Sequence, residues 1–227
     1  MTHTSKIVTL LLVATLITAF LPVTVHAQMI KGQVMGGFNL AQVDGDEVYG
    51  YKRIGGNLGV GAIIPLGKNW DISLETSFNQ KGAFQKPQYE SDSLNGAYEI
   101  RLNYVEVPVL IHYTDKEFIT GGLGFSWGRL VGAREYEHER LTATTANNGV
   151  YNLNDFCIVL DLRIRLVDRL KFNFRYQYSM VKIREREYSN LANESWNRNQ
   201  FNNLLTFRLV YVFNEPLGSQ RPAKLTE

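Results

Sequence analysis

Hydrophobic and polar residues alternate one by one along residues 170–180, which read LKFNFRYQYSM. Every even-numbered position there is apolar or aromatic, and every odd-numbered position is polar. A period of two is that of a β-strand with two unlike faces. Such a strand belongs either to a soluble sheet that packs its apolar face inward or to a membrane barrel that turns it outward to lipid.

The same alternation recurs along the chain and predicts eight strands. They are expected at residues 32–43, 54–64, 70–79, 102–113, 118–130, 154–166, 170–180 and 202–213. Pro108 lies in the fourth of them, and because proline cannot donate a ladder hydrogen bond we expect the pairing to be interrupted there.

The connections between these strands alternate in length. Tight turns are expected near Gly67, Asp115 and Asp168, and longer polar loops at residues 44–53, 80–100, 133–151 and 189–200. We expect the charged segment 182–187 to continue the seventh strand past the membrane. Short turns at one end and long loops at the other are typical of outer-membrane barrels, so the pattern favours an all-β, eight-stranded, antiparallel up-and-down transmembrane barrel.

Aromatic residues near the predicted strand ends support the membrane barrel. They are Trp70, Phe78, Trp127, Phe156, Tyr178, Tyr211 and Phe213. Tryptophan, tyrosine and phenylalanine form girdles at the two interfaces of such barrels.

Charges of both signs occupy the polar faces. In a soluble, lipocalin-like barrel they would form a solvated surface, whereas in a membrane barrel they would point inward and would need to be paired. For the membrane barrel we expect an interior charge network of Asp71, Glu75, Glu106, Asp161, Arg163, Arg165, Lys171, Arg175 and Arg208.

The N-terminus carries the features of an export signal. Lys6 precedes an uncharged apolar run at residues 7–21, and Val25-His26-Ala27 has small residues at the positions that signal peptidase reads. An uncleaved anchor is the alternative, but the run is short for a spanning helix. We therefore expect a cleaved signal peptide at residues 1–27, a barrel at 28–213 and a C-terminal periplasmic tail at 214–227.

Composition narrows the chemistry. The single cysteine, Cys157, excludes an internal disulfide framework and leaves no multi-cysteine metal site. Lysine and arginine number 24 and aspartate and glutamate 22, so the formal net charge is +2 and gives no indication of a nucleic-acid partner.

Four segments resemble the PorT-type outer-membrane β-barrel family of Bacteroidota, a porin-family group with an outer membrane protein β-barrel domain. They are Gln80-Lys81-Gly82, a YxExP pattern at Tyr104, Glu106 and Pro108, Gly121-Gly122-Leu123-Gly124, and Phe174-Arg175-Tyr176. Residues 155–165 depart from the family in lacking glycines.

The resemblance implies a small barrel in the outer membrane, in contact with outer-membrane lipids and lipopolysaccharide and inserted by the barrel assembly machinery. The family's namesake is linked to type IX protein secretion. We expect a non-enzymatic barrel with a side-chain-filled interior and long surface loops, in a structural role or binding a protein partner. An accessory role in type IX secretion is one alternative, and a soluble ligand-binding barrel is another.

Catalysis is not expected. Eight strands leave an interior just wide enough for side chains, which argues against an open pore. His112 and His138 are the candidates for a lipid-modifying hydrolase, but neither has a serine and an acid within a strand period. The sequence therefore predicts no catalytic, cofactor-binding or metal-binding residues.

Overall fold

The computed structural model describes residues 30–89, 95–189 and 194–215, and these form an all-β structure. Its strands are β1 (Lys31–Asp44), β2 (Arg53–Pro65), β3 (Trp70–Gln85), β4 (Tyr98–Asp115), β5 (Ile119–Glu137), β6 (Arg140–Leu141), β7 (Asn154–Val167), β8 (Leu170–Ser179), β9 (Arg184–Ser189) and β10 (Ser195–Val212). No helix in these residues is long and apolar enough to cross a membrane.

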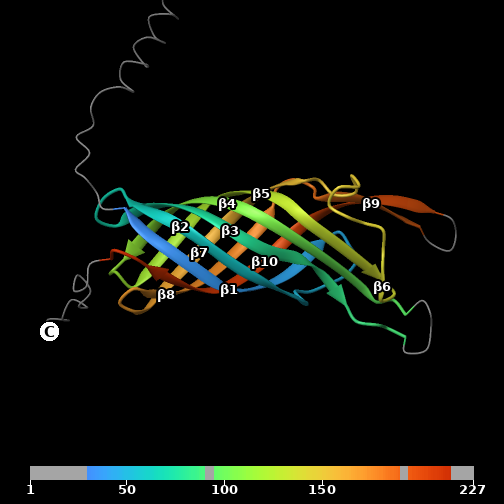
Figure 1. Ribbon diagram of the computed structural model, residues 1–227, viewed down its shortest axis with the longest axis horizontal. Helices are drawn as coiled ribbons and strands as arrows, with labels where there is room; N and C mark the ends of the chain where they lie inside the picture. Colours follow the sequence, from blue (N-terminus) through green and yellow to red (C-terminus); the bar gives the residue numbers. More distant parts are fainter. Residues whose placement is uncertain (1–29, 90–94, 190–193, 216–227) are drawn as a thin grey trace, which may run out of the picture.

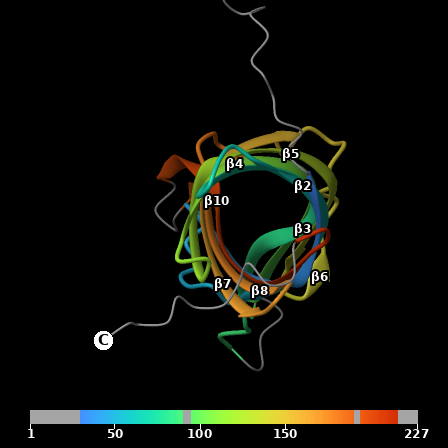
Figure 2. The same ribbon diagram turned by 90° about the vertical axis from the view of Figure 1, so that its left-hand side faces the viewer.

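Eight of the strands close into a barrel. In the order β1, β2, β3, β4, β5, β7, β8 and β10 each strand pairs antiparallel with the next, and β10 pairs with β1 to complete the ring. Figure 2 shows this ring end-on, and Figure 1 shows its strands tilted against the long axis. The two remaining strands lie outside it, because β6 pairs only with β5 and β9 only with β10, at the end opposite the short turns. The predicted eight-stranded barrel is therefore confirmed.

The apolar and polar faces of the strands point in the directions that a membrane barrel requires. Leu123, Phe125 and Trp127 of β5 point outward with 48%, 60% and 43% of their surfaces exposed, whereas Ser126 between them is 2% exposed. The other ring strands repeat this arrangement, with apolar residues outside and polar residues inside. The soluble, lipocalin-like alternative is therefore wrong, because it needs the apolar faces to point inward.

The outward apolar surface has clear edges. On β5 it runs from Ile119 to Trp127 and ends where Arg129 points outward. Trp70 packs edge-on against Tyr113 at the short-turn edge, with ring centroids 5.0 Å apart. Trp127 lies opposite Phe156 at the other edge. Aromatic residues thus flank an apolar surface about nine residues tall, which matches tilted strands crossing the bilayer core.

Several strands continue far beyond this surface, contrary to the sequence prediction. Both ends of the loop predicted at residues 80–100 are strand, because β3 extends to Gln85 and β4 begins at Tyr98. In the same way β5 reaches Glu137 and β10 begins at Ser195. Outside the bilayer neither face of a strand has to be apolar, so the ladder continues where the alternation ends.

The prediction for the charged segment after β8 is also wrong. This segment does not continue that strand, which ends at Ser179. After a break at residues 180–183 the chain resumes as a separate strand, β9, which pairs with β10 beyond the apolar surface along Arg184↔Gln200 to Ser189↔Ser195.

Two backbone features interrupt the regular ladder. Pairing of β3 with β4 stops at Leu74↔Val109 and resumes at Ser77↔Glu106, so the break expected at Pro108 is present. Gly82 of β3 has φ +133°, and a Cβ at this position would collide with the carbonyl oxygen of Ile100 on β4. Only glycine adopts such a conformation without strain.

We predict that Gly82→Ala lowers the free energy of unfolding by about 1–3 kcal/mol, the scale of a strained backbone conformation. Gly121→Ala is the matched control, because a Cβ there meets no atom within 4 Å. Urea unfolding in detergent micelles, followed by the difference in gel mobility between boiled and unboiled samples, measures both. Equal stabilities of the two variants would contradict the prediction.

Candidate functional site

The centre of the barrel holds a cluster of five buried charged side chains. Glu75 of β3 accepts hydrogen bonds from Arg163 at 2.9 Å, from Arg175 at 2.9 and 3.0 Å, and from Arg208 at 3.0 Å. Asp161 of β7 accepts from the Nε atoms of Arg163 at 2.8 Å and Arg175 at 2.7 Å. Each of the five residues is at most 5% exposed. We call these residues the Glu75 cluster.

His112 extends the Glu75 cluster toward β4. Its Nε2 atom lies 3.2 Å from Asp161 Oδ2. Gly122 of β5 makes room for the imidazole, because a Cβ at that position would overlap the ring. His112 is therefore held inside the lumen as a structural partner of Asp161.

A second cluster lies nearer the loop end and is centred on Lys81 of β3. The Lys81 ammonium is 2.6 Å from Glu106 Oε1 and 3.0 Å from Asp155 Oδ2, and all three side chains are at most 1% exposed. It also lies 4.9 Å from the centroid of the Tyr104 ring, a cation–π distance. We call Lys81, Glu106 and Asp155 the Lys81 cluster.

The two clusters balance each other in charge. Arg163, Arg175, Arg208 and Lys81 are four cations, and Glu75, Asp161, Glu106 and Asp155 are four carboxylates. A buried charge without a partner is costly, whereas a paired and hydrogen-bonded one is tolerated. The lumen within the membrane can therefore stay filled and desolvated.

The Lys81 cluster contains side chains that could serve as metal ligands. Glu106, Asp155 and Cys157 are the one group of three potential ligands that lie close enough together within the described ranges. The Lys81 ammonium stands among them, 3.6 Å from Cys157 Sγ and in contact with both carboxylates. A metal ion there would have to displace this resident cation, so the arrangement supports an internal ion pair.

The predicted network residues divide into several groups. Glu75, Asp161, Arg163, Arg175 and Arg208 come together in one cluster, and Glu106 lies in the other. Three predicted members lie apart from both. Arg165 and Lys171 are at the short-turn end, where Lys171 Nζ lies 3.1 Å and Arg165 NH2 3.9 Å from Glu215. Asp71 joins no ion pair among residues 30–89, 95–189 and 194–215.

Sequence reasoning misses Lys81 and Asp155. Lys81 lies two positions beyond Asn79, the predicted end of the third strand. Because side chains alternate along a strand, it points inward as Asn79 does. Asp155 lies on the polar face of its strand as expected but is absent from the predicted network. Its partner lies 74 positions away in the sequence, so only the closed barrel shows the pairing.

The motifs behind the family resemblance converge in these clusters. Lys81 belongs to the Gln80-Lys81-Gly82 segment and contacts both Tyr104 and Glu106 of the YxExP pattern. Arg175 of the Phe174-Arg175-Tyr176 segment binds the carboxylates of the Glu75 cluster. These residues therefore act together to fill the lumen.

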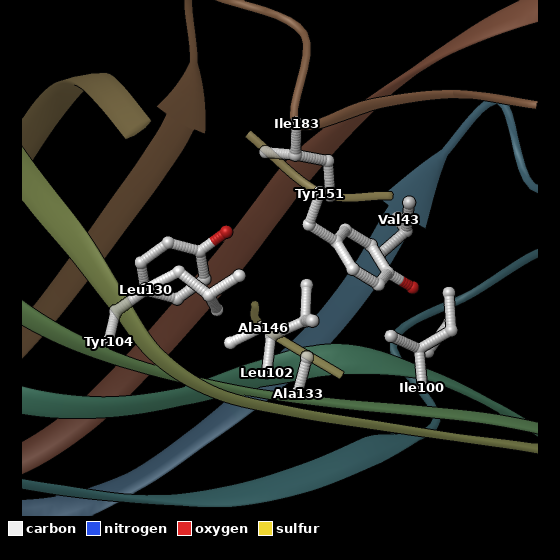
Figure 3. Close-up of a cluster of buried hydrophobic side chains, with 10 residues drawn as sticks. Val43, Ile100, Leu102, Tyr104, Leu130, Ala133, Ala146, Tyr151 and Ile183 are labelled. Atoms are coloured by element: carbon white, nitrogen blue, oxygen red, sulfur yellow. The ribbon is translucent and has the colours of Figure 1, made fainter. Parts of the chain in front are cut away.

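An apolar plug closes the lumen beyond the Lys81 cluster (Figure 3). Strands and connections both contribute to it. Tyr151 and Ala146 come from the connection between β6 and β7, and Ile183 comes from the connection between β8 and β9. The plug consists of Val43, Ala83, Ile100, Leu102, Tyr104, Leu130, Ala133, Ala146, Tyr151 and Ile183, each at most 9% exposed. The burial of these residues keeps water away from their side chains in the outer lumen.

Arg184 lies at the plug and fastens β9 to the barrel wall. Its guanidinium donates to Glu135 of β5 at 2.8 Å and to Gln200 of β10 at 2.9 Å, and it lies 4.7 Å from the Tyr151 ring centroid. Burial raises the pKa of Glu135, but the hydrogen bond and charge of Arg184 outweigh it and hold that pKa below its usual value. The β9–β10 hairpin is therefore a fixed part of the outer mouth.

Asp46, in the loop at the barrel mouth, is a buried acidic residue whose carboxyl group is only partly hydrogen-bonded. Its Oδ1 atom accepts the Val48 N–H at 2.9 Å, but Oδ2 is buried without a hydrogen-bond partner among the described residues. Burial raises the pKa of this carboxyl from 3.8 to about 7. The loop between β1 and β2 therefore favours the protonated acid.

We predict that Glu75→Gln destabilises the barrel by about 3–5 kcal/mol, because three buried arginines lose their shared counter-charge. The double variant E75Q/R208M should recover part of this loss, since it removes one unpaired cation. Glu185→Gln, on the exposed face of β9, is the control and should change stability little. Urea unfolding in micelles measures all three, and an E75Q barrel as stable as the wild type would contradict the role of Glu75.

We predict that protection of the 45–50 loop falls as the pH rises through about 7, because the fold favours protonated Asp46. The stabilisation is complete below pH 3.8, the ordinary pKa, and is lost as Asp46 ionises. Asp46→Asn should remove this dependence, whereas Glu47→Gln should keep it. Hydrogen exchange at pH 5.5 and 8.5, corrected for intrinsic rates, measures the effect. Equal pH dependence in D46N and wild type would refute the prediction.

Comparison with known proteins agrees with this architecture. Residues 26–185 match the family model described as "Outer membrane protein beta-barrel domain". A search of curated proteins finds no match.

The search of solved structures finds several similar chains. Ail of Yersinia pestis, in complex with a heparin analogue, is 11% identical with a TM-score of 0.47, and the alignment covers 81% of this chain and 99% of Ail. A major outer membrane protein of Thermus thermophilus is 13% identical with a TM-score of 0.48, over 82% of this chain and all of that one. OprG of Pseudomonas aeruginosa is 14% identical with a TM-score of 0.39, over 82% and 97%.

The family match spans well over half of the sequence, from before β1 into β9. Together with the outward apolar surface and the paired charges inside, it locates the protein in the outer membrane. The chain belongs to the outer membrane protein β-barrel domain family.

Proposed function

We propose that the protein is a sealed, non-enzymatic barrel that acts through the structure it presents at its loop end, either by stabilising the membrane or by binding a protein partner. The observation that carries this proposal is the filled lumen. Two clusters of opposite net charge, which balance each other, and an apolar plug follow one another along the barrel axis, which leaves no evident route for ions or solutes.

The loop end supports the second half of the proposal. Strands β3, β4, β5 and β10 extend well beyond the apolar surface, and the β9–β10 hairpin stands beside them. Arg186 fixes that hairpin to β4 and β5 through Tyr98 at 2.9 Å and Glu135 at 3.3 Å. A rigid, wall-like extension is suited to contacts with another macromolecule, because little conformational entropy is lost on binding.

Both histidines considered for catalysis have structural roles, which supports a non-enzymatic barrel. His112 is enclosed in the lumen with Asp161. His138 Nδ1 accepts the backbone N–H of Gly96 at 3.1 Å and so joins the connection after β5 to the one before β4. Neither ring has a free nitrogen beside a hydroxyl nucleophile in the part of the chain that the structure describes.

Membership of the PorT-type group of Bacteroidota is a finer proposal, supported by the contacts among the Lys81, Tyr104, Glu106 and Arg175 motif residues. An accessory role in type IX secretion rests on that resemblance alone. A deletion strain tests it: cargo proteins retained in the periplasm would support the role, and an unchanged set of secreted proteins would contradict it.

We predict that the purified barrel shows no discrete conductance steps in a planar lipid bilayer, because the lumen is filled by paired charges and closed by the apolar plug. A general diffusion porin reconstituted in the same bilayer is the positive control. Folded protein is confirmed beforehand by the mobility difference between boiled and unboiled samples. Reproducible single-channel steps from the folded protein would overturn the sealed barrel.

A further inference from the structure

Three arginines gather on the outer wall of β4 and β5, just past the apolar surface. They are Arg101 of β4 and Arg129 and Arg134 of β5, and all three are exposed. We call them the arginine patch. We propose that the arginine patch binds the phosphate groups of an anionic glycolipid in the outer leaflet, as in the phosphorylated headgroup of lipopolysaccharide.

The height of the arginine patch on the wall matches a lipid headgroup. Arg129 is two positions beyond Trp127, the aromatic residue at the loop-side edge of the apolar surface on β5. Arg101 lies four positions beyond Val105, the last outward apolar residue on β4. At about 3.3 Å per residue and a tilt of about 40°, these side chains begin about 5–10 Å above the apolar edge, within the polar layer of a bilayer.

A β-bulge turns Arg134 toward the membrane side of the wall. Pairing of β4 with β5 shifts register between Asn103↔Gly132 and Tyr104↔Leu130, which leaves Val131 as an extra residue. Arg129 points outward, so strict alternation would turn Arg134 into the lumen. The extra residue returns it to the outer face, which is the effect of a bulge on the side chains that follow it.

The arginine patch brings like charges together without enough counter-charge. Arg101 and Arg134 are direct cross-strand neighbours, a pairing that is destabilising for two cations. Glu99 binds Arg101 at 2.9 Å, but it also binds Arg53 at 3.2 Å, so one carboxylate serves two arginines. Arg134 has no hydrogen-bond or ion-pair partner in residues 30–89, 95–189 and 194–215.

The chemistry of these side chains fits phosphate. A guanidinium presents parallel N–H donors that bind phosphate oxygens in pairs. Arg101 is held in place by Glu99 and by the Tyr136 ring, 5.0 Å from its guanidinium carbon. Arg129 donates to Asn154 of β7 at 3.1 Å, so it too is oriented. Arg101 and Arg134 are direct neighbours and can bind one phosphate together, while Arg129, opposite Val105 and about 13 Å along the strand, is placed for another phosphate of the same headgroup.

The arginine patch is bordered by uncharged residues on β3. On the adjacent strand β3, the outward residues at comparable height are Gln80 and Phe84, which are uncharged, and the next cation in this direction is Arg53 of β2, which is bound to Glu99. The arginine patch is therefore a local feature and not part of a uniform basic ring. It lies on the outside of the wall, so the inference needs only the outer-membrane location and is independent of the sealed lumen.

The test compares R101Q/R134Q with K182Q/R198Q in the full-length protein. Both variants remove two positive charges, but Lys182 and Arg198 belong to the β9–β10 hairpin and its approach. The probe is bisphosphorylated lipid A in mixed micelles, with the same lipid after enzymatic removal of its phosphates and with inorganic phosphate alone. Bound lipid per folded barrel is measured by native mass spectrometry and by titration.

We expect wild type and K182Q/R198Q to bind lipid A alike, and R101Q/R134Q to bind it at least about tenfold more weakly, the loss of one charged hydrogen-bonded contact. Removing the phosphates should weaken wild-type binding by a similar factor. Arg134→Lys should give an intermediate affinity, because it keeps the charge but loses the paired donors.

Two results would overturn the proposal. One is equal lipid A binding by R101Q/R134Q and wild type when both migrate as folded barrels. The other is binding of inorganic phosphate as tight as that of lipid A, which would identify a site for free anions in place of one for a lipid headgroup.

Discussion

Mutual neutralisation of charges inside a narrow, lipid-surrounded lumen is the constraint on which this barrel depends. The apolar faces of the strands are turned to lipid, so every charged side chain on the opposite faces has to be accommodated inside. Eight strands leave no room for a water-filled channel that could solvate those charges. Glu75 and Asp161 therefore hold three arginines, and Lys81 is held between Glu106 and Asp155.

The backbone accommodates this packing at specific positions. The ladder between β3 and β4 is broken beside Glu75, where Pro108 has no N–H to donate. Gly122 gives the His112 ring the space it needs, and Gly82 lets β3 approach β4 closely just after Lys81. The same side chains that fill the lumen thus determine where glycine and proline are required in the surrounding strands.

Beyond the apolar surface the strands no longer contact lipid, and the residue types on their two faces change. No lipid surrounds the extended strands, so polar residues such as Arg101 occupy their outer faces. Their inner faces carry apolar residues such as Ile100 and Leu102, which form the apolar plug together with Tyr151 and Ile183 of the connections. The bulge at Val131 reverses the alternation on β5 and brings Arg134 to the outer wall while Glu135 faces the mouth and binds Arg184. A single inserted residue thereby separates an outward-facing cation, Arg134, from the internal ion pair of Glu135 and Arg184.

The sequence by itself determined the strand number from the repeated period of two, and the break at Pro108 from proline chemistry. The outward direction of the apolar faces was predicted from the alternation of short and long connections and from the aromatic residues near the strand ends. The sequence did not determine strand ends such as Gln85 and Tyr98, because the alternation stops at the membrane edge while hydrogen bonding continues. It also could not show that Lys81 pairs with Asp155 or that Arg165 and Lys171 bind Glu215 instead of the central clusters. Those partners lie on different strands, and only closure of the ring and the heights of the residues along its axis decide which charges meet.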